Sequence, residues 1–488
     1  MRISVTTKYL TLILAISFVL FFPSLTTFFT HDDFFLLKIS RIETFREFLN
    51  FFSLVRGPEG LGMYRPLGMQ IFYLLDWKLF NLNPLWLHLV AFLTFFFVIY
   101  LVYKLINLLT NNKKIGITAS FLYAVSASHF AHLYAFGVYV ELLVTLFALL
   151  SCISFIYYLE TRLLKNIFFT FLFFMGGLFS KETFVVIPVL LILIYLFLLL
   201  RKKKILARPK DILLALIPFF MTIAGYFFMR FKFFGFPEGE SYVWIISLRV
   251  VNTLFWYFLW AMNLPEMLVD FVGPGLRFNP NLFKFYSKEI TPIFLLFLLQ
   301  LLFLLYAFIS WIRKSRNQKM TELLFSFGWF AVSLTPVLFL PLHKFTYYLT
   351  LPLVGIVLFI SILLENIKPV RIKVSFLVAW LLLSFFTLGL TAKTHWITQG
   401  AKIAEKIHHY LVENKSIAQD YKEIAFYDTE ADKDLPWRPS ELVKVVLSNQ
   451  NYFKVFWNDK LTAKYYNSQQ EIQESGVLYI HARDFLGY

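Results

Sequence analysis

The sequence predicts an all-α polytopic membrane protein with about eleven transmembrane helices, followed by a small C-terminal extracytoplasmic α/β unit. Three observations lead to this fold class. Of the 488 residues, 59% are hydrophobic and 16% are charged, whereas soluble domains have roughly 45–50% apolar and about 25% charged residues. The apolar residues gather in runs of about 20, which is the length of a membrane-spanning helix. Short clusters of Lys and Arg separate these runs.

Eleven segments have the length and hydrophobicity expected of a transmembrane helix. They are 9–29, 85–106, 115–132, 138–159, 166–180, 183–200, 211–230, 290–312, 321–341, 346–365 and 373–392. The first follows Arg2 and Lys8, as in a signal peptide. Its apolar part is longer than a signal core, however, and no small-residue cleavage site stands out. We therefore interpret it as a retained first span.

The positions of the basic residues predict the orientation. The clusters are Lys104/Lys113/Lys114, Arg162/Lys165, Arg201–Lys204 with Arg208 and Lys210, Arg313/Lys314/Arg316/Lys319, and Lys368/Arg371/Lys373. With a cytoplasmic N-terminus, eleven spans place all of them on the cytoplasmic side, in agreement with the positive-inside rule. We expect a multi-pass protein of the cell (plasma) membrane.

The segment 249–268 is also apolar but is not expected to span the membrane. If it did, the last two basic clusters would move outside, against the positive-inside rule. Arg249, Asn252 and the Asn263-Leu264-Pro265-Glu266 end interrupt it. We expect it to lie in the outer interface or to re-enter the membrane.

This topology divides the chain into a transmembrane domain, 1–392, and a small extracytoplasmic domain, 393–488. The extracytoplasmic loops of the first are 30–84 and 231–289. The stretch 64–80 is expected to be an amphipathic helix because apolar residues recur at helical spacing. These residues are Leu67, Ile71, Leu74, Leu75 and Leu79.

The C-terminal domain regains polar residues and alternates predicted strands with a helix. The predicted strands are Glu423–Asp428, Phe453–Trp457 and Val477–His481. The predicted helix is Glu441–Ser448, entered through Pro439-Ser440 with the serine as its N-cap.

Two function classes are disfavoured by composition. The net charge of +16 and the pI near 9.5 are compatible with nucleic-acid binding, but the basic residues fall in loops between spans, so no nucleic-acid partner is expected. The second class is CxxC metal or redox proteins: the single cysteine, Cys152, lies in an apolar run, cannot form an intramolecular disulfide and belongs to no CxxC motif.

His31-Asp32-Asp33 follows the first span directly and is the first candidate site. Two adjacent carboxylates that leave the membrane together repel each other, which raises the pKa of at least one. Such a pair suits a general base or a ligand for a divalent cation. The alternative is a solvated stop signal beside a span. No second acidic cluster clearly completes a metal site, so no cofactor is assigned beyond that cation.

Three further segments place cations in the same predicted outer layer. Tyr64-Arg65-Pro66-Leu67 offers an arginine to a phosphate or to lipid headgroups. In Ser180-Lys181-Glu182 the lysine either pairs with its neighbour or binds a phosphate. His343-Lys344 with Tyr347-Tyr348 resembles either a binding site or an anchoring belt.

His129, His132 and Glu141 are expected at the outer ends of the third and fourth spans. Metal ligation and structural hydrogen bonding are both open for them, although their spacing is not HExxH. Acids and cations on one side suit a lipid-borne phosphate in the headgroup plane. A channel or transporter would instead need charges within the spans, where almost none occur.

Four segments resemble the C-type (GT-C) multi-spanning glycosyltransferases that use polyprenyl-phosphate sugars, in particular the protein O-mannosyltransferases and the tetratricopeptide-bearing O-mannosyltransferases. They are HDDFFLL after the first span, YRPLGMQIFYLLDWKLFNLNPLWLHLV, HFAHLYAFGVYVELLVTLFALLS followed by GLFSKETFVVIPVLL, and HKFTYYLTLPLVGIVL. Their order relative to the spans matches the family over most of residues 28–360.

The resemblance implies inverting transfer of a sugar, mannose in much of this branch, from a polyprenyl-phosphate carrier to an acceptor hydroxyl on the extracytoplasmic face. The acceptor would be a protein Ser/Thr, a glycan or a lipid, and membrane lipid surrounds the enzyme. By resemblance, Asp32 and Asp33 take the catalytic position. The expected substrate- and phosphate-binding residues are Arg65, Lys181, Glu182, His129, Lys344, Tyr347 and Tyr348.

The sequence also departs from the family pattern. Tyr347 stands where a basic residue is expected, with Lys344 three residues earlier, and Tyr139 replaces a frequent arginine. The α/β unit stands where tetratricopeptide repeats would follow. The alternatives are a lipid or polysaccharide transporter of the cell envelope and a scaffold protein that acts through residues 393–488.

Overall fold

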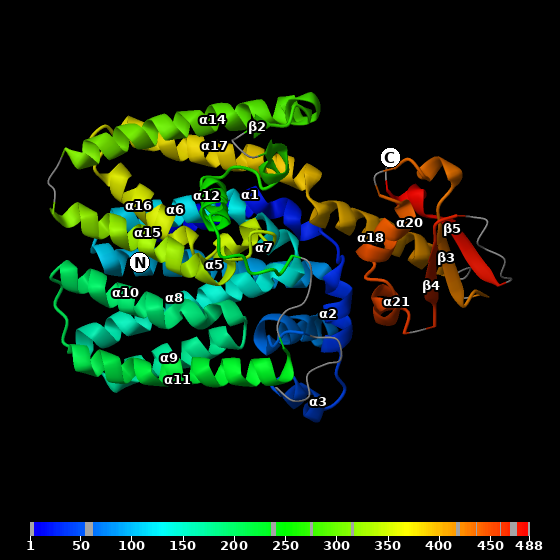
Figure 1. Cartoon of the computed structure of the whole chain (residues 1–488), viewed down its shortest axis with the longest axis horizontal. Helices are drawn as coiled ribbons and strands as arrows, with labels where there is room; N and C mark the ends of the chain where they lie inside the picture. Colours follow the sequence, from blue (N-terminus) through cyan, green and yellow to red (C-terminus); the bar gives the residue numbers. More distant parts are fainter. Residues whose placement is uncertain are drawn as a thin grey trace.

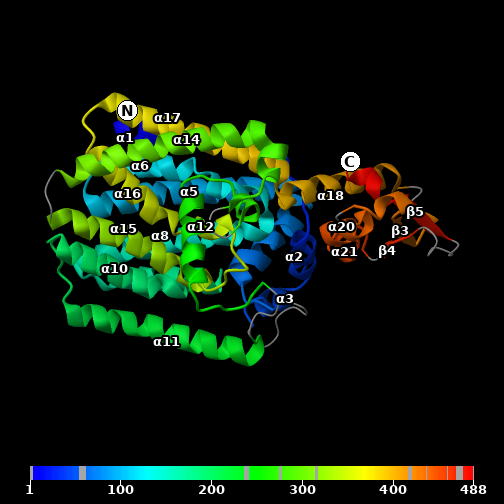
Figure 2. The same cartoon turned by 45° about the horizontal axis from the view of Figure 1, so that its top comes forward.

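The computed structural model describes residues 4–53, 62–235, 241–273, 277–313, 317–415, 420–435, 437–458, 460–468 and 476–486. Long helices run side by side in a bundle, and a smaller unit with a sheet is attached at one end (Figures 1 and 2). All eleven predicted spans are helical over most of their length. The corresponding helices are α1 (Val5–Phe21), α5 (Pro84–Thr110), α6 (Lys113–Ala124), α8 (Tyr139–Thr161), α9 (Leu164–Leu178), α10 (Ile187–Leu200), α11 (Pro209–Phe233), α14 (Asn281–Ile312), α15 (Asn317–Leu338), α16 (Leu353–Glu365) and α17 (Val370–Thr394).

Eight helical segments in the described part of the chain are long and apolar enough to cross a membrane. The other three predicted spans form shorter helices: α6, α9 and α16 have 12, 15 and 13 residues. At 1.5 Å per residue these helices are about 18 to 22 Å long, compared with about 30 Å for the hydrocarbon core. Each is extended by short 3-10 turns or loops at the end of the bundle that carries the candidate site.

The α10–α11 turn, which carries Arg201–Lys204 and Arg208, lies at the other end of the bundle, at the left of Figure 1. Ion pairs join helices there, among them Arg162 with Asp211 at 2.9 Å and Arg201 with Glu322 at 2.6 Å. Of the predicted basic residues, Lys314 and Arg316 lie outside the described residues.

The segment 249–268 forms the 13-residue helix α12 (Arg249–Ala261) and the one-turn α13 (Leu268–Phe271). It is not among the helices of membrane-spanning length, in agreement with the prediction. In Figure 1, α12 runs across the direction of the bundle helices. Its end is fixed by the Asn263 amide oxygen, which accepts hydrogen bonds from the Ser126 hydroxyl (2.8 Å) and the Ala127 amide (2.9 Å).

The first loop after α1 is helical as well. It contains η1 (Phe22–Thr26), α2 (Asp32–Ser40), α3 (Phe45–Asn50) and a continuous helix made of η2 (Pro66–Ile71), α4 (Phe72–Leu75) and η3 (Asp76–Phe80). The predicted helix over 64–80 is therefore present. Its buried residues include Tyr73 and Asp76, whereas Leu79 is 66% exposed. At a membrane an exposed leucine contacts lipid rather than water. Such a helix can therefore turn its leucines outward and its polar side chains toward the rest of the protein.

The remaining short elements connect the helices near the candidate site. They are η4 (Ala127–His129), α7 (Phe130–Tyr134), η5 (Phe136–Val138), η6 (Glu182–Val186), the strand pair β1 (Val272–Gly273) and β2 (Arg277–Phe278), and η8 (Thr346–Leu349). All of them join segments at the end where α6, α9 and α16 stop short.

The C-terminal unit is a three-stranded parallel sheet covered by helices. Its elements are α18 (Trp396–Glu413), β3 (Glu423–Tyr427), η9 (Glu430–Asp432), α20 (Pro439–Val446), α21 (Asn451–Phe456), β4 (Thr462–Tyr466), β5 (Val477–His481) and η11 (Ala482–Phe485). The strand order is β4-β3-β5, with Ile424 opposite Ala463 and Leu478.

Two local predictions for this unit were wrong. Phe453–Trp457 was expected to be a strand, but it lies mainly in helix α21. The strand that follows this helix and pairs with β3 is β4. On a helix, Tyr452 and Phe456 can both contact Phe34 of α2, at ring distances of 5.3 and 6.3 Å, so tertiary packing outweighs strand propensity. Ser440 is not the N-cap of α20, because the helix begins at Pro439.

Candidate functional site

The sequence-predicted polar residues come from α2, the helix beginning at Pro66, the α9–α10 turn and the α15–α16 turn. Arg65 precedes the second of these and is placed by a close helix contact. The Leu67 amide donates to the Phe179 carbonyl oxygen at 3.1 Å. A Cβ on Gly68 would lie 2.8 Å from the Ser180 carbonyl oxygen, so glycine is required for this approach. The contact brings Arg65 beside Lys181-Glu182.

Asp33 is a buried carboxylate with three hydrogen-bond donors around it. Its Oδ2 accepts from the Thr30 amide at 3.0 Å, and its Oδ1 accepts from the Tyr73 hydroxyl at 2.5 Å and the Gly137 amide at 3.1 Å. Burial raises the pKa of Asp33 to about 7, although the bonds from Tyr73 and the backbone act in the opposite direction. Asp33 therefore joins α2 to the Pro66 helix and to the start of α8.

Asp32, in contrast, is exposed and accepts no hydrogen bond from a described residue. The surrounding protein still desolvates its carboxyl group enough to raise the pKa above the ordinary value for aspartate. It follows His31, whose backbone has φ 54° and ψ −122°, a conformation that costs energy for a residue with a side chain. The strained residue and the buried Asp33 together present the Asp32 carboxylate at the surface.

Arg65 and Glu182 form a two-point ion pair. The Arg65 Nε donates to one carboxylate oxygen at 2.9 Å and Nη2 donates to the other at 2.5 Å. Arg65 is 9% exposed. A bidentate pair of this kind fixes the guanidinium plane, so the three remaining N–H bonds of Arg65 have defined directions.

Lys181 pairs with Glu141 of α8 rather than with its neighbour Glu182. Both residues are 5% exposed. The Lys181 ammonium also lies over the rings of Tyr348 and Tyr347, at 4.7 and 5.9 Å from their centroids. The two predicted tyrosines therefore cover the cation, which favours a positive charge at this point.

Tyr242 interacts electrostatically with charged residues from two of these segments. Burial raises its pKa, and the charges of Arg65, Glu182 and Asp32 all act on it. Its ring packs on that of His343 at a centroid distance of 4.2 Å. The Tyr242 hydroxyl is therefore within electrostatic reach of Asp32 and of the Arg65–Glu182 pair.

Lys344 lies on another side of the aromatic group. It interacts electrostatically with Asp270 and makes no hydrogen bond with the described residues. Nearby, a Glu266 carboxylate oxygen accepts hydrogen bonds from the Thr346 amide and hydroxyl, both at 2.6 Å, and the other lies 3.6 Å from His395. These contacts hold the 343–348 turn, and neither Asp270 nor Glu266 was predicted as a site residue.

His129 and His132 lie beneath the site, 0% and 1% exposed. His129 Nε2 donates to the Tyr123 carbonyl oxygen at 2.9 Å and His132 Nε2 donates to the Tyr347 carbonyl oxygen at 2.8 Å. In this conformation they support the turns around the site. The substrate-binding role expected for His129 stays a prediction.

The residues present do not fit a divalent cation at Asp32-Asp33. Within the described ranges, no group of three or more His, Cys, Asp or Glu side chains could hold a metal ion. Asp33 is already engaged by three donors, which leaves Asp32 as a single free carboxylate.

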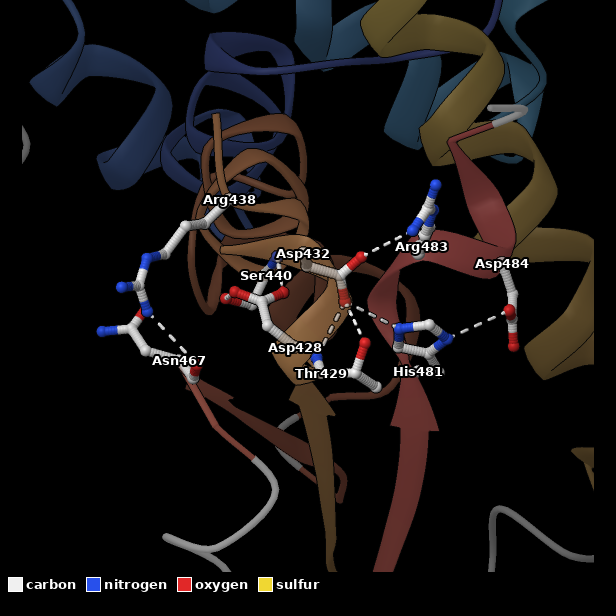
Figure 3. Close-up of polar contacts among 9 residues, drawn as sticks. All are labelled: Asp428, Thr429, Asp432, Arg438, Ser440, Asn467, His481, Arg483 and Asp484. Carbon is white, nitrogen blue, oxygen red and sulfur yellow. Dashed lines mark hydrogen bonds and ion pairs between the residues drawn. The ribbon is translucent and has the colours of Figure 1, made fainter. Parts of the chain in front are cut away.

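A second polar cluster lies in the C-terminal unit, where β3 and β5 end (Figure 3). The buried Asp432 accepts hydrogen bonds from the Thr429 amide and hydroxyl, from His481 at 3.0 Å and from Arg483 at 3.2 Å. Asp428 accepts two bonds from Ser440, both at 2.7 Å. These carboxylates are satisfied by their neighbours and join the ends of the two strands.

Comparisons with known proteins give few matches. No protein-family model and no curated protein matches the sequence. A solved structure with a similar arrangement is that of the Archaeoglobus fulgidus oligosaccharyltransferase in complex with zinc and sulfate. The two chains are 13% identical, with a TM-score of 0.46, and the match covers 90% of this chain and 61% of the other. The chain thus spans about three fifths of that protein's length, and a likeness at this level assigns no activity.

Proposed function

We propose that the protein is a membrane glycosyltransferase that moves a sugar from a polyprenyl-phosphate carrier to an acceptor hydroxyl. One observation carries the proposal: Asp33, the neighbour of the exposed Asp32 carboxylate, is hydrogen-bonded to Tyr73 of the helix that begins directly after the buried Arg65. The short helices α6, α9 and α16 end next to the turns and short helices that carry these residues. A lipid-linked phosphate and an acceptor hydroxyl could meet there.

Asp32 acts as the general base in this proposal. Its carboxylate removes the proton of the acceptor hydroxyl, and the oxygen attacks the anomeric carbon from the face opposite the phosphate. The bond between that carbon and the phosphate oxygen breaks, and the electron pair remains on the carrier phosphate. The configuration inverts, and the phosphate changes from one negative charge to two. In this proposal Arg65 and Lys181 stabilise that developing charge.

Asp33 has a different role from Asp32. Because its oxygens face three protein donors, it positions α2 and does not contact the acceptor. The sequence resemblance supports mannose or a related hexose as the sugar and a protein, glycan or lipid as the acceptor. The basic loops support an extracytoplasmic site in the cell membrane.

The proposal is tested with purified protein in lipid nanodiscs and a panel of polyprenyl-phosphate sugars. Release of the carrier phosphate is measured with and without acceptor hydroxyl compounds. We expect release with at least one donor and its loss in Asp32→Asn. No release from any donor, or full release by Asp32→Asn, would contradict the proposal.

A further inference from the structure

Trp396 is an exposed tryptophan at the point where the bundle meets the C-terminal unit (Figure 1). It is the first residue of α18, two residues after the end of α17, and it is 48% exposed. A tryptophan beyond the end of a membrane span is ordinarily an anchor in the lipid interface. The contacts of this ring indicate a different role.

The Trp396 ring packs against the residue that precedes the candidate base. Its centroid lies 4.9 Å from that of the His31 ring, with the two planes at 81°. Gly400, one turn later in α18, lies against the same imidazole, since a Cβ there would be 2.9 Å from Nδ1. Residues four apart share a face of a helix. That face of α18 therefore holds His31, and Asp32 follows it directly.

On its other side Trp396 is connected to the 343–348 turn. Its ring lies 5.5 Å from that of His395, whose Nε2 is 3.6 Å from a Glu266 carboxylate oxygen. The other Glu266 oxygen accepts two hydrogen bonds from Thr346, both at 2.6 Å. A chain of contacts thus runs from the residue beside Asp32, through Trp396, to the turn whose tyrosines cover Lys181.

The polar groups beside the indole suit hydroxyl groups. His31 Nδ1 forms a 2.7 Å hydrogen bond with the Thr30 hydroxyl, and Nε2 makes none with a described residue. Burial lowers the pKa of His31 to about 4, so the ring is neutral at neutral pH and Nε2 can bond a hydroxyl, which both donates and accepts. The C–H bonds on one face of a pyranose ring pack on the negative face of an indole. An exposed tryptophan beside an uncharged polar group is therefore suited to a sugar.

The position of Trp396 relative to the proposed reaction indicates which sugar it contacts. In that reaction Asp32 takes the proton of the acceptor hydroxyl, and the phosphate leaves from the opposite face of the anomeric carbon toward Arg65 and Lys181. Trp396 contacts the residue next to the base. It therefore belongs to the acceptor side.

We infer that Trp396, with His31, binds the acceptor, and that this acceptor is a hexopyranoside rather than a serine or threonine of a protein. The inference rests on the proposed function and extends it by naming the acceptor class. One face of the acceptor ring packs on the indole, and one of its hydroxyls lies at the Asp32 carboxylate. The hexopyranoside is the end of a glycan or the headgroup of a glycolipid.

The first test compares acceptors with the full-length protein in nanodiscs, with a panel of polyprenyl-phosphate sugars as donors. The acceptors are a methyl hexopyranoside, an octyl hexopyranoside and a short peptide with Ser and Thr. Transfer of the sugar to each acceptor is measured. We expect transfer to the glycosides and none to the peptide. Preference for the octyl glycoside would identify a glycolipid, and equal use of both glycosides a free glycan.

The second test uses Trp396→Leu, which removes the aromatic platform, and Trp396→Phe, which keeps a ring against His31. Trp437→Leu is the matched control, because Trp437 is an exposed tryptophan of the same C-terminal unit. We expect the KM for the glycoside to rise about tenfold in Trp396→Leu, less in Trp396→Phe and not in the control. Donor binding and the unfolding temperature should stay at the wild-type values, since Trp396 is exposed.

Transfer to the peptide alone, or an unchanged KM for the glycoside in Trp396→Leu, would overturn the inference. The second result would reduce Trp396 to an anchor in the lipid interface. Both results would leave the proposed function intact. Absence of carrier release by the wild type with every donor and acceptor would instead remove the proposed function itself.

Discussion

The His31 amide donates a 2.8 Å hydrogen bond to the carbonyl oxygen of Val446. The bond joins the first loop to helix α20 of the C-terminal unit, more than 400 residues later in the chain. The His31 ring also meets the edge of the Trp396 ring at 4.9 Å. The C-terminal unit therefore contacts the residue that directly precedes the candidate base and helps to hold its strained backbone.

The substitution Gly400→Ala tests this contact. A Cβ at Gly400 would overlap the His31 ring and lie 2.7 Å from the Thr30 hydroxyl. We expect Gly400→Ala to displace His31 and to lower transfer activity at least about tenfold, because catalytic groups tolerate little displacement. Gly389→Ala is the control, since nothing lies within 4 Å of that Cβ. Equal activity of the two variants would show that the contact does not position Asp32.

Asp32 and Asp33 should respond differently to the same substitution. Asp32→Asn should keep the folded structure and lose about 10²- to 10⁴-fold in rate, as expected when a general base is removed. Asp33→Asn must place an amide group against N–H or O–H donors, so it should lower the free energy of unfolding by about 1 to 3 kcal/mol. Activity assays and thermal unfolding of both variants are the measurements, and identical behaviour would contradict the assignment.

The pH dependence of stability reports on Asp33. Because burial raises its pKa to about 7, the folded state binds more protons than the unfolded state between about pH 4 and pH 7. This contribution to stability is fully present below pH 4 and is lost as the pH rises through 7. In Tyr73→Phe the Asp33 carboxylate loses a hydrogen-bond donor, so its pKa rises further. The contribution to stability should then persist to a higher pH, toward about 8, before it is lost. Thermal unfolding of the wild type and of Tyr73→Phe is measured between pH 5 and pH 9. If the unfolding temperatures of the two proteins changed in parallel with pH, Asp33 would not be the group responsible.

The Lys181–Glu141 pair allows stability to be separated from activity. Lys181→Met leaves the buried Glu141 without a partner, which should cost about 3 to 5 kcal/mol. The double variant Lys181→Met/Glu141→Gln removes both charges and should recover most of that stability. Transfer activity should stay low in the double variant because the cation near the phosphate is missing. Recovery of activity together with stability would limit Lys181 to a structural role.

The hydrophobic pattern predicted the helices well, because a membrane helix is defined by one continuous apolar run. All eleven runs are helical, and 249–268 is not a helix of spanning length. Polar partners were harder to predict, since they lie far apart in sequence. Lys181 was expected to pair with Glu182 or with a phosphate, yet its partner is Glu141, forty residues earlier.

The pattern of apolar runs is enough to identify the segments suited to lipid and the polar residues that follow them, because the cost of placing charges in hydrocarbon acts on each segment separately. Folding then determines that Asp33 is enclosed while Asp32 is exposed, and that Lys181 pairs with Glu141 while Arg65 pairs with Glu182. These differences depend on distances between helices, which arise when side chains from several segments pack together.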